Sequence, residues 1–357
     1  MEKYSRWRDA GTGIQPFLPP VPPRTESSLL HTMSNVVHYI VCPIQGIVKL
    51  LIVAIITLAY VLFVPVLGTL FSPLAFAHRL WTRFFSALLL RLVLFFSGFF
   101  YIKTETISLR KGRGTNSTKP QFNVCSGDIV VSNWTSYIDI LYLACRWDPV
   151  FTQIFPVENK VCRVSLWQAI RLCGSTPIMS AADAGVDKKD LWTLKELAKK
   201  AKEQHWGPVI VFPEGTPSNG RALLQFSPIF KDFKSTDRGI AIHGMAFKYE
   251  YSNLPPSYTV GNMFFHYASI CSQFYNYMTI KQLSDEDTPC SASKGSLSGI
   301  PQSADFSSFA ASDDWVGSQL ISSLSTMARL RKTHLGMEDK RAFMNYYNQH
   351  GKKQRTA

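Results

Sequence analysis

The chain has 357 residues, of which 46% are hydrophobic, with a formal net charge of +13 and seven cysteines. A positive charge of this size suits nucleic acid, an anionic membrane or a phosphorylated substrate. The sequence contains neither a nucleic-acid-binding module nor a Cys/His metal spacing, so we expect no nucleic-acid partner and no metal. The cysteines are scattered among apolar neighbours, which predicts reduced thiols in a domain that faces the cytosol.

Residues 1–37 are predicted to form a proline-rich N-terminal arm. Five prolines fall between positions 16 and 23, and this spacing excludes a regular helix there. No positively charged start runs directly into an apolar stretch, so we expect no secretory signal peptide. The arm is therefore expected to be exposed.

Residues 38–102 are predicted to anchor the chain in a membrane. The run from Leu50 to Phe71 holds 22 uncharged residues, which as a helix would be about 33 Å long, enough to cross a bilayer. The following stretch, 76–102, differs because its three arginines fall within an arc of about 120° on a helical wheel. We expect a hairpin or an in-plane helix rather than a second span; the arginines are Arg79, Arg83 and Arg91.

Residues 103–283 are predicted to form an α/β domain. Segments 122–133 and 207–216 read as buried strands, and an amphipathic helix over 187–207, with Gly207 at its end, separates them. A further strand is expected over 239–250, then a helix and a strand within 260–283.

The C-terminal part is predicted to lie outside this core. Residues 284–314 are Ser-rich and acidic, which indicates a linker. Residues 315–357 read as a basic helical tail with eight Lys or Arg from Arg329 onward. Such a tail forms either a solvated face or a contact for anionic lipid.

Two stretches carry candidate chemistry. In "VFPEGTPSNG" (211–220) a buried strand delivers Glu214 into a turn that contains Gly215 and Thr216. In "SNWTSYIDIL" (132–141) a strand end turns into a helix that carries Asp139. Carboxylates at the carboxyl ends of strands are typical of ligand sites in α/β proteins, although either stretch taken alone is also compatible with an ordinary turn.

Together, the two stretches resemble the first and third signature blocks of the glycerolipid acyltransferase family, N-H-x-S-x-x-D and F-P-E-G-T-R-S. The resemblance covers about residues 120–270, and the very start of the chain resembles fungal lysophosphatidic acid acyltransferases of the endoplasmic reticulum and lipid droplets. The matching residues are Asn133, Ser136 and Asp139 in the first block and Phe212, Pro213, Glu214, Gly215, Thr216 and Ser218 in the third.

The resemblance implies a mixed sheet flanked by helices, preceded by a membrane helix or hairpin. It implies transfer of an acyl chain from acyl-CoA, which is a substrate, to a lysophospholipid hydroxyl, with lysophosphatidic acid and phosphatidic acid as the expected acceptor and product and no separate cofactor. The expected location is the endoplasmic reticulum membrane and the lipid droplet, with the catalytic domain facing the cytosol.

The resemblance also assigns roles to residues. In the family a histidine takes the proton of the acceptor hydroxyl, an aspartate orients the histidine, and the Glu-Gly-Thr loop holds the polar end of the acceptor. Asp139 inherits the aspartate position. The remaining candidates would contact substrate: Asn133, Trp134, Ser136, Glu214, Gly215 and Thr216.

The chain departs from the family pattern at the base and at two cations. Trp134 occupies the histidine position, and an indole N–H only donates. Pro217 and Ser180 stand where arginines are expected. Three readings stay open: Asp139 is itself the base, His243 supplies an imidazole from the strand 239–250, or the domain binds lipid or a protein partner without turnover.

The other polar candidates are weaker. Arg221, just after the Glu214 loop, and Arg171, just before Gly174, are candidates for the missing phosphate ligand, because a guanidinium binds a phosphate in bidentate fashion. Lone histidines in apolar segments are more often structural, and this applies to His205 and His266 as well as to His243.

Overall fold

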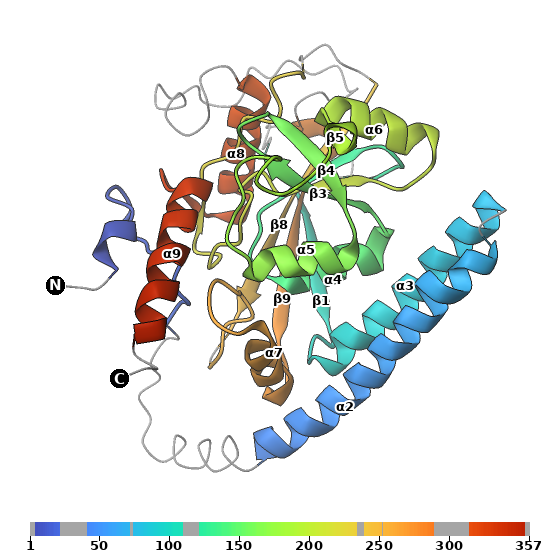
Figure 1. Ribbon diagram of the computed structural model, residues 1–357, viewed down its shortest axis with the longest axis horizontal. Coiled ribbons are helices and arrows are strands. Elements are labelled where there is room, and N and C mark those ends of the chain that lie inside the picture. Colours follow the sequence, from blue (N-terminus) through green and yellow to red (C-terminus); the bar gives the residue numbers. More distant parts are fainter. Residues whose placement is uncertain are drawn as a thin grey trace, which may run out of the picture.

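The computed structural model describes residues 4–21, 41–71, 74–109, 121–233, 239–251, 253–288 and 314–353 (Figure 1). The strands are β1 (Ile102–Ile107), β2 (Ile129–Ser132), β3 (Val150–Phe155), β4 (Lys160–Val164), β5 (Leu191–Trp192), β6 (Val209–Val211), β7 (Ala222–Leu223), β8 (Ile242–Glu250), β9 (Tyr277–Leu283) and β10 (Arg331–Lys332). The α-helices are α2 (Cys42–Val61), α3 (Ala75–Phe96), α4 (Tyr137–Trp147), α5 (Leu166–Gly174), α6 (Leu194–Glu203), α7 (Met263–Ser272), α8 (Trp315–Ala328) and α9 (Met337–Lys353).

Eight strands form one mixed sheet in the order β1-β9-β8-β2-β6-β3-β4-β5. At its centre β2 pairs in parallel with both β6 and β8, so that Ile129 lies opposite Val209 on one side and Ile242 on the other. Strands β2 and β6 are rich in β-branched residues and fully buried, as strands covered on both faces are. The predicted α/β class and the mixed sheet flanked by helices are confirmed.

Helices cover both faces of the sheet. Alternate residues of β2 and β6 point to opposite faces: Val130 and Ile210 pack under α3, α4, α5 and α7, whereas Val131 and Val211 pack under α6 and α8. The core therefore has two apolar layers, one on each side of the sheet.

The predicted helix over 187–207 is shorter than expected. Thr193 caps α6, because its side chain accepts from the backbone N–H of Glu196 while Glu196 reaches back to Thr193. Leu191, which was expected on the helix face, lies in β5 and pairs with Cys162. Helix α6 ends at Glu203, four residues before Gly207.

Helices α2 and α3 lie side by side as an antiparallel hairpin along one flank of the domain (Figure 1). Helix α2 continues through a π-helical turn containing Pro65 and a short 3-10 turn to Phe71, and Cys42–Phe71 is, among the described residues, the one helix long and apolar enough to cross a membrane. Both helices keep large apolar side chains exposed, including Ile47, Leu51, Ile55, Leu58, Phe76, Leu80, Phe84, Leu88 and Leu92.

The arginines of α3 face the domain and not the exposed apolar side. Arg79 forms a salt bridge with Asp148 at 3.0 Å and also donates to the carbonyl of Asp148 at the end of α4. Arg91 donates to the carbonyls of Phe99 and Phe100 just beyond α3. Two arginines of the arc, Arg79 and Arg91, therefore make intramolecular contacts, whereas Arg83 is exposed.

The described part of the N-terminal arm, residues 4–21, is packed against the domain, in contrast to the expected exposed arm. Trp7 is 6% exposed and Phe17 1% exposed, and both rings contact Phe343 of α9. Asn219 donates to the carbonyls of Gln15 and Leu18. The aromatic and amide contacts stabilise an arm whose prolines exclude regular structure.

The described C-terminal helices are also part of the core, in contrast to the expected separate tail. Leu320 and Leu324 of α8 are fully buried against the sheet, and Phe343 of α9 is fully buried against the arm. The expected linker over 284–314 begins with ordered residues, because Asp287 accepts from the backbone of Leu109. The rest of that segment, 289–313, lies outside the described residues.

Candidate active site

Two loops meet at the carboxyl ends of β2 and β6, and each carries one of the sequence motifs. The first runs from Asn133 to Ser136, between β2 and α4, and the second from Phe212 to Gly220, after β6. The backbone N–H of Ser218 donates to the carbonyl of Trp134 at 2.9 Å, which joins the loops. Neighbouring parallel strands bring their following loops together in this way, as the two motifs predict.

Asp139 is fully buried and accepts hydrogen bonds from four donors. Its Oδ2 accepts from the backbone N–H and the hydroxyl of Thr135 and from the backbone N–H of Ser136, each at 2.8 Å. Its Oδ1 accepts from the hydroxyl of Tyr249 on β8. Burial raises the pKa of Asp139 from 3.8 to about 6, although the four donors act in the opposite direction.

Two of the predicted substrate contacts are occupied by the protein itself. The side-chain amide of Asn133 donates to the carbonyl of Phe247 and accepts from the backbone N–H of the same residue, which extends the contact between β2 and β8. Ser136 caps α4 and donates to the carbonyl of Pro256. Both side chains therefore hold the loop in shape.

Glu214 is fully buried, and neither of its carboxylate oxygens has a well-formed hydrogen bond among the described residues, although the backbones of Trp134 and Leu224 and the Ser218 side chain lie close enough to lower its pKa. Burial raises the pKa of Glu214 well above its usual value, and the nearby charge of Asp139 acts in the same direction. Gly215 follows with a φ of +63°, and a Cβ there would lie 2.6 Å from the sulfur of Met337 in α9. The turn therefore requires glycine both for its conformation and for the close approach of α9.

Several buried polar atoms around the two loops lack a partner within the described part of the chain. An unpaired buried polar atom costs about 1–3 kcal/mol. Their concentration next to both motifs marks a place that a polar ligand would satisfy. These atoms are Trp134 Nε1, Glu214 Oε1 and Oε2, Thr216 Oγ1, Ser257 Oγ and Thr259 Oγ1.

Trp134 fills the position at which the family carries its base. Its ring stacks on Phe212 with centroids 4.8 Å apart and planes 19° apart, and the residue is 5% exposed. The cavity between this pair, Gly215 and Met337 measures about 20 Å³, which is room for a single water. The substrate site is thus nearly closed, and Met337 of α9 is part of the cover.

Lys340 of α9 is a site residue that the sequence analysis missed. It is 1% exposed, and its Nζ donates to the carbonyl of Thr259 at 2.8 Å. The Cys173 thiol lies within electrostatic range of both Lys340 and Asp139. Burial lowers the pKa of Lys340 to about 7. Because Met337 and Lys340 are three residues apart, they share the face of α9 that covers the site.

Of the two candidate phosphate ligands, Arg221 lies outside this chamber. Arg221 is exposed and donates to the carbonyl of Val21 in the arm. Arg171 is exposed on α5 and lines a wider cavity of about 830 Å³. Ser180, at the other position where a cation is expected, donates to Glu158 at 2.6 Å.

His243 lies at the opposite end of the sheet and cannot serve as the base. Its two ring nitrogens lie 2.9 Å from a carboxylate oxygen of Asp285 and 3.4 Å from one of Asp128, the residue that precedes β2. The sequence pattern could not reveal this, because His243 pairs with Val130 near the start of β2 while the motifs follow its end.

An apolar groove of about 400 Å³ runs from the hairpin toward the first motif. Val53 of α2, Leu90 of α3 and Tyr137 of α4 lie along it. Tyr137 follows Ser136 directly, and its hydroxyl is 2.8 Å from Nδ1 of His266. Burial lowers the pKa of His266, so this imidazole is neutral near pH 7.

The wider cavity adjoins the closed chamber on the side of α5. Gln153, Leu172, Ser175 and Ile178 line both spaces. Beyond them the cavity holds Arg163, stacked on Trp206, and Lys200, stacked on Trp192. Asp187 and Asp190 also line it, so the cavity offers aromatic faces and an excess of one positive charge next to the site.

Comparison with known proteins agrees with this geometry. Residues 116–235 match the family model described as Acyltransferase. Over 263 residues the chain is 31% identical to a Schizosaccharomyces pombe protein named "Putative lysophosphatidic acid:oleoyl-CoA acyltransferase", and the match covers 73% of this chain and 76% of that protein. No solved structure matches the chain.

Proposed function

Because this chain belongs to the acyltransferase family, we propose that it transfers an acyl chain from acyl-CoA to the free hydroxyl of lysophosphatidic acid at a membrane surface. The observation that carries the proposal is the set of unpaired buried polar atoms around Glu214. A chamber that only stabilised the fold would have no reason to bury a carboxylate without a donor. The hydroxyls and phosphate of the acceptor supply the missing partners.

Asp139 is the proposed general base. The acceptor hydroxyl attacks the thioester carbonyl, Asp139 takes the hydroxyl proton through Oδ1, and the C–S bond breaks as the C–O ester bond forms. The proton then passes to the departing CoA thiolate, which restores the carboxylate. A pKa of about 6 suits a base that works near neutral pH.

Trp134 takes a different role from the residue it replaces. Its buried indole N–H lies beside the Cys173 thiol and has no well-formed hydrogen bond among the described residues, so it can donate to the oxyanion that develops on the thioester oxygen. The stack on Phe212 fixes the ring in place. The chemistry then uses a donor from position 134 and a base from position 139.

Lys340 is the proposed partner of the acceptor phosphate and replaces the cations missing at Pro217 and Ser180. Within the described part of the chain one of its three N–H donors is used, toward Thr259. A bound phosphate raises the pKa of Lys340 and holds the ammonium charged. Glu214, with Thr216 beside it, is the proposed hydrogen-bond partner of the acceptor hydroxyl.

The hairpin supports a position of this chamber at the membrane surface. The exposed apolar faces of α2 and α3 are suited to the lipid, in either a spanning or an in-plane arrangement. The apolar groove beside Tyr137 accommodates the acyl chain, and the wider cavity with Arg163, Arg171 and Lys200 accommodates the anionic end of acyl-CoA. The expected location remains the endoplasmic reticulum and lipid droplets, with the domain on the cytosolic side.

A second candidate function is a lipid- or protein-binding module without turnover. It is favoured by the Trp134–Phe212 stack, which leaves only about 20 Å³ at the family's base position. In that case the unpaired atoms around Glu214 bind a headgroup that is never acylated.

The test is a mass-spectrometric assay of the purified full-length chain with acyl-CoA and a panel of lysolipids. The proposal expects phosphatidic acid from lysophosphatidic acid, at a rate well above that with lysophosphatidylcholine, whose phosphate is a diester. Binding of lysophosphatidic acid without any ester product would favour the second function. A result of neither binding nor product with any lysolipid would overturn acyl transfer and lipid binding, and would leave protein binding as the second function.

A further inference from the structure

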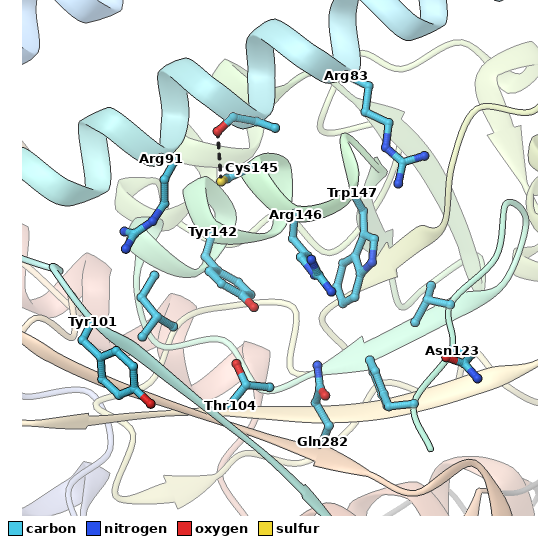
Figure 2. A pocket seen from close by; sticks show the side chains of 14 residues that line it. Arg83, Arg91, Tyr101, Thr104, Asn123, Tyr142, Cys145, Arg146, Trp147 and Gln282 are labelled. Atoms are coloured by element: carbon cyan, nitrogen blue, oxygen red, sulfur yellow. Dashed lines mark hydrogen bonds between the residues drawn. The ribbon is translucent and has the colours of Figure 1, made fainter. Parts of the chain in front are cut away.

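Another cavity, also of about 830 Å³ but distinct from the one beside α5, lies between the hairpin and the β1 edge of the sheet (Figure 2). Arg83 and Arg91 of α3 and Arg146 of α4 line it from the helix side. Thr104 of β1 and Gln282 of β9 line the opposite wall with neutral polar groups. Figure 2 shows Arg146 reaching into the space between these walls, with Arg83 and Arg91 at its two sides.

The charges of this cavity are not balanced by its own walls. No Asp or Glu is among the described residues that line it. The nearest acid that acts on Arg83 is Asp148, and Asp148 is already paired with Arg79 at 3.0 Å. Glu105 of β1 is paired with Lys103 at 2.6 Å, and strand alternation places both on the other side from Thr104.

The arginines also have free donors within the described structure. Arg91 uses two of its N–H groups for the carbonyls of Phe99 and Phe100, and a guanidinium has five. For Arg83 and Arg146 the described residues provide neither a hydrogen bond nor a salt-bridge partner. Three guanidinium groups around one polar hollow match the oxygens of a phosphate, which accepts bidentate hydrogen bonds.

We propose that this cavity is a second binding site, for the phosphate group of an anionic phospholipid in the membrane that the hairpin contacts. Helix α3 forms the border between the two environments, because its arginines face the cavity while Leu80, Phe84 and Leu88 face outward. A lipid next to α3 can therefore place its headgroup in the cavity while its chains stay with the apolar face of the helix.

This site is separate from the acyl-transfer chamber. Helix α4 begins at Tyr137, beside the chamber, and ends at Trp147, beside the arginine cavity. Its 11 residues span about 16 Å at the rise of an α-helix. Lipid binding here would hold the domain on anionic membranes without occupying the catalytic carboxylates. The inference rests on the membrane placement of the hairpin but not on turnover.

The experiment compares Arg83→Gln/Arg146→Gln with Lys189→Gln/Lys199→Gln, which removes the same charge from exposed positions near α6. Full-length protein is titrated with phosphatidylcholine vesicles, with or without one-fifth phosphatidic acid, and separately with inorganic phosphate. We expect the arginine pair to weaken binding to anionic vesicles about 25-fold and the lysine pair less than about threefold. Binding to neutral vesicles, acyl transfer in detergent and the unfolding midpoint should not change.

Equal binding of the arginine pair and the wild type to anionic vesicles would overturn the proposal. Wild-type binding of inorganic phosphate without any preference for anionic vesicles would overturn the lipid as its source. Because these measurements need no turnover, a chain inactive in acyl transfer would still give a result here, and the two proposals fail separately.

Discussion

The two ends of the central sheet bury similar chemical groups in opposite ways. At the amino end, His243 lies between Asp128 and Asp285, and each ring nitrogen has a carboxylate partner. At the carboxyl end, Glu214 and several hydroxyls are buried without partners. The difference teaches that the pairing of His243 is explained by the fold, whereas a concentration of unpaired polar atoms beside the two motifs points to a ligand.

Asp139 lies at the carboxyl end of the sheet, but unlike Glu214 it has hydrogen-bond donors for both carboxylate oxygens. A substitution there therefore tests the comparison most strongly. In Asp139→Asn the amide oxygen can still accept from Thr135 and Ser136, and the amide N–H can donate to Tyr249, so the fold should persist. The side chain loses its basicity, however. We expect acyl transfer to fall about 100-fold or more, measured as kcat/KM for lysophosphatidic acid.

The matched control for this substitution is Asp128→Asn at the amino end. Asp128 accepts from the backbone N–H of Cys125 at 2.7 Å, and its loss should affect stability but not the rate of the folded protein. If Asp139→Asn kept full activity while His266→Gln lost it, the neutral imidazole beside Tyr137 would be the base instead.

Lys340→Met tests whether α9 contributes a phosphate ligand. Methionine keeps the length and the packing between Phe17 and Phe343, which both lie near Nζ. A hydrogen bond to a charged group contributes about 1.5–3 kcal/mol, so kcat/KM for lysophosphatidic acid should fall about 10- to 100-fold. With monoacylglycerol, which has no phosphate, the change should be less than about twofold.

An equal loss with both acceptors would contradict this role for Lys340. The neighbouring, exposed Arg341 provides the control, because Arg341→Gln removes a charge from the same helix but not from the buried face. Lysophosphatidic acid kinetics with this variant should match those of the wild type.

The pH dependence of kcat/KM follows from the ionisation of Asp139 in the free protein. Below its pKa of about 6 the base is protonated, so kcat/KM should rise about tenfold per pH unit toward pH 6 and then level off. The pH dependence of stability has the opposite sign, because stability falls as the pH rises. The folded pKa exceeds the unfolded value of 3.8, so the native state binds the proton more tightly and loses up to about 3 kcal/mol as pH rises from 4 to 6. A profile without an inflection near pH 6 would exclude Asp139 as the base.

Trp134→His should produce the smallest effect on rate. The imidazole can donate an N–H from the same position and restores the family's usual side chain, so we expect acyl transfer to change by no more than about tenfold. The smaller ring leaves space against Phe212, so the unfolding midpoint should fall because of the cavity. Kinetics and thermal unfolding of the same sample check both parts, and a rise of more than about tenfold would contradict the assignment of the indole as the oxyanion donor.

Much of the fold was predictable from local patterns. The strands β2 and β6, the helix and strand in 260–283, and the apolar hairpin all follow from period and composition. The apolar pattern predicts a helix over 187–207, but the helix begins only after Thr193, which forms a capping box with Glu196. The packing of the arm and of α9 could not be predicted, because Trp7 and Phe343 form a contact only after the whole domain has folded.

The candidate site was predicted in part for the same reason. Glu214 and Asp139 lie in stretches that end neighbouring strands, so their proximity follows from topology. Lys340 lies 126 positions beyond Glu214 in a stretch that reads as a solvated basic face, and no local signal marks it as buried. His243 was a candidate base in the sequence, but the sequence of an apolar strand does not show whether a histidine lies near the amino or the carboxyl end of the sheet.

The most direct test of the account is a paired measurement on Glu214→Gln and His243→Gln, with kcat/KM and the free energy of unfolding determined for each. The account predicts that Glu214→Gln abolishes most acyl transfer with stability unchanged or higher, because an unpaired buried carboxylate is removed. It predicts that His243→Gln costs about 1–3 kcal/mol of stability and leaves kcat/KM of the folded protein unchanged. A stable, fully active Glu214→Gln protein would contradict the assignment of the carboxyl end as the site of acyl transfer.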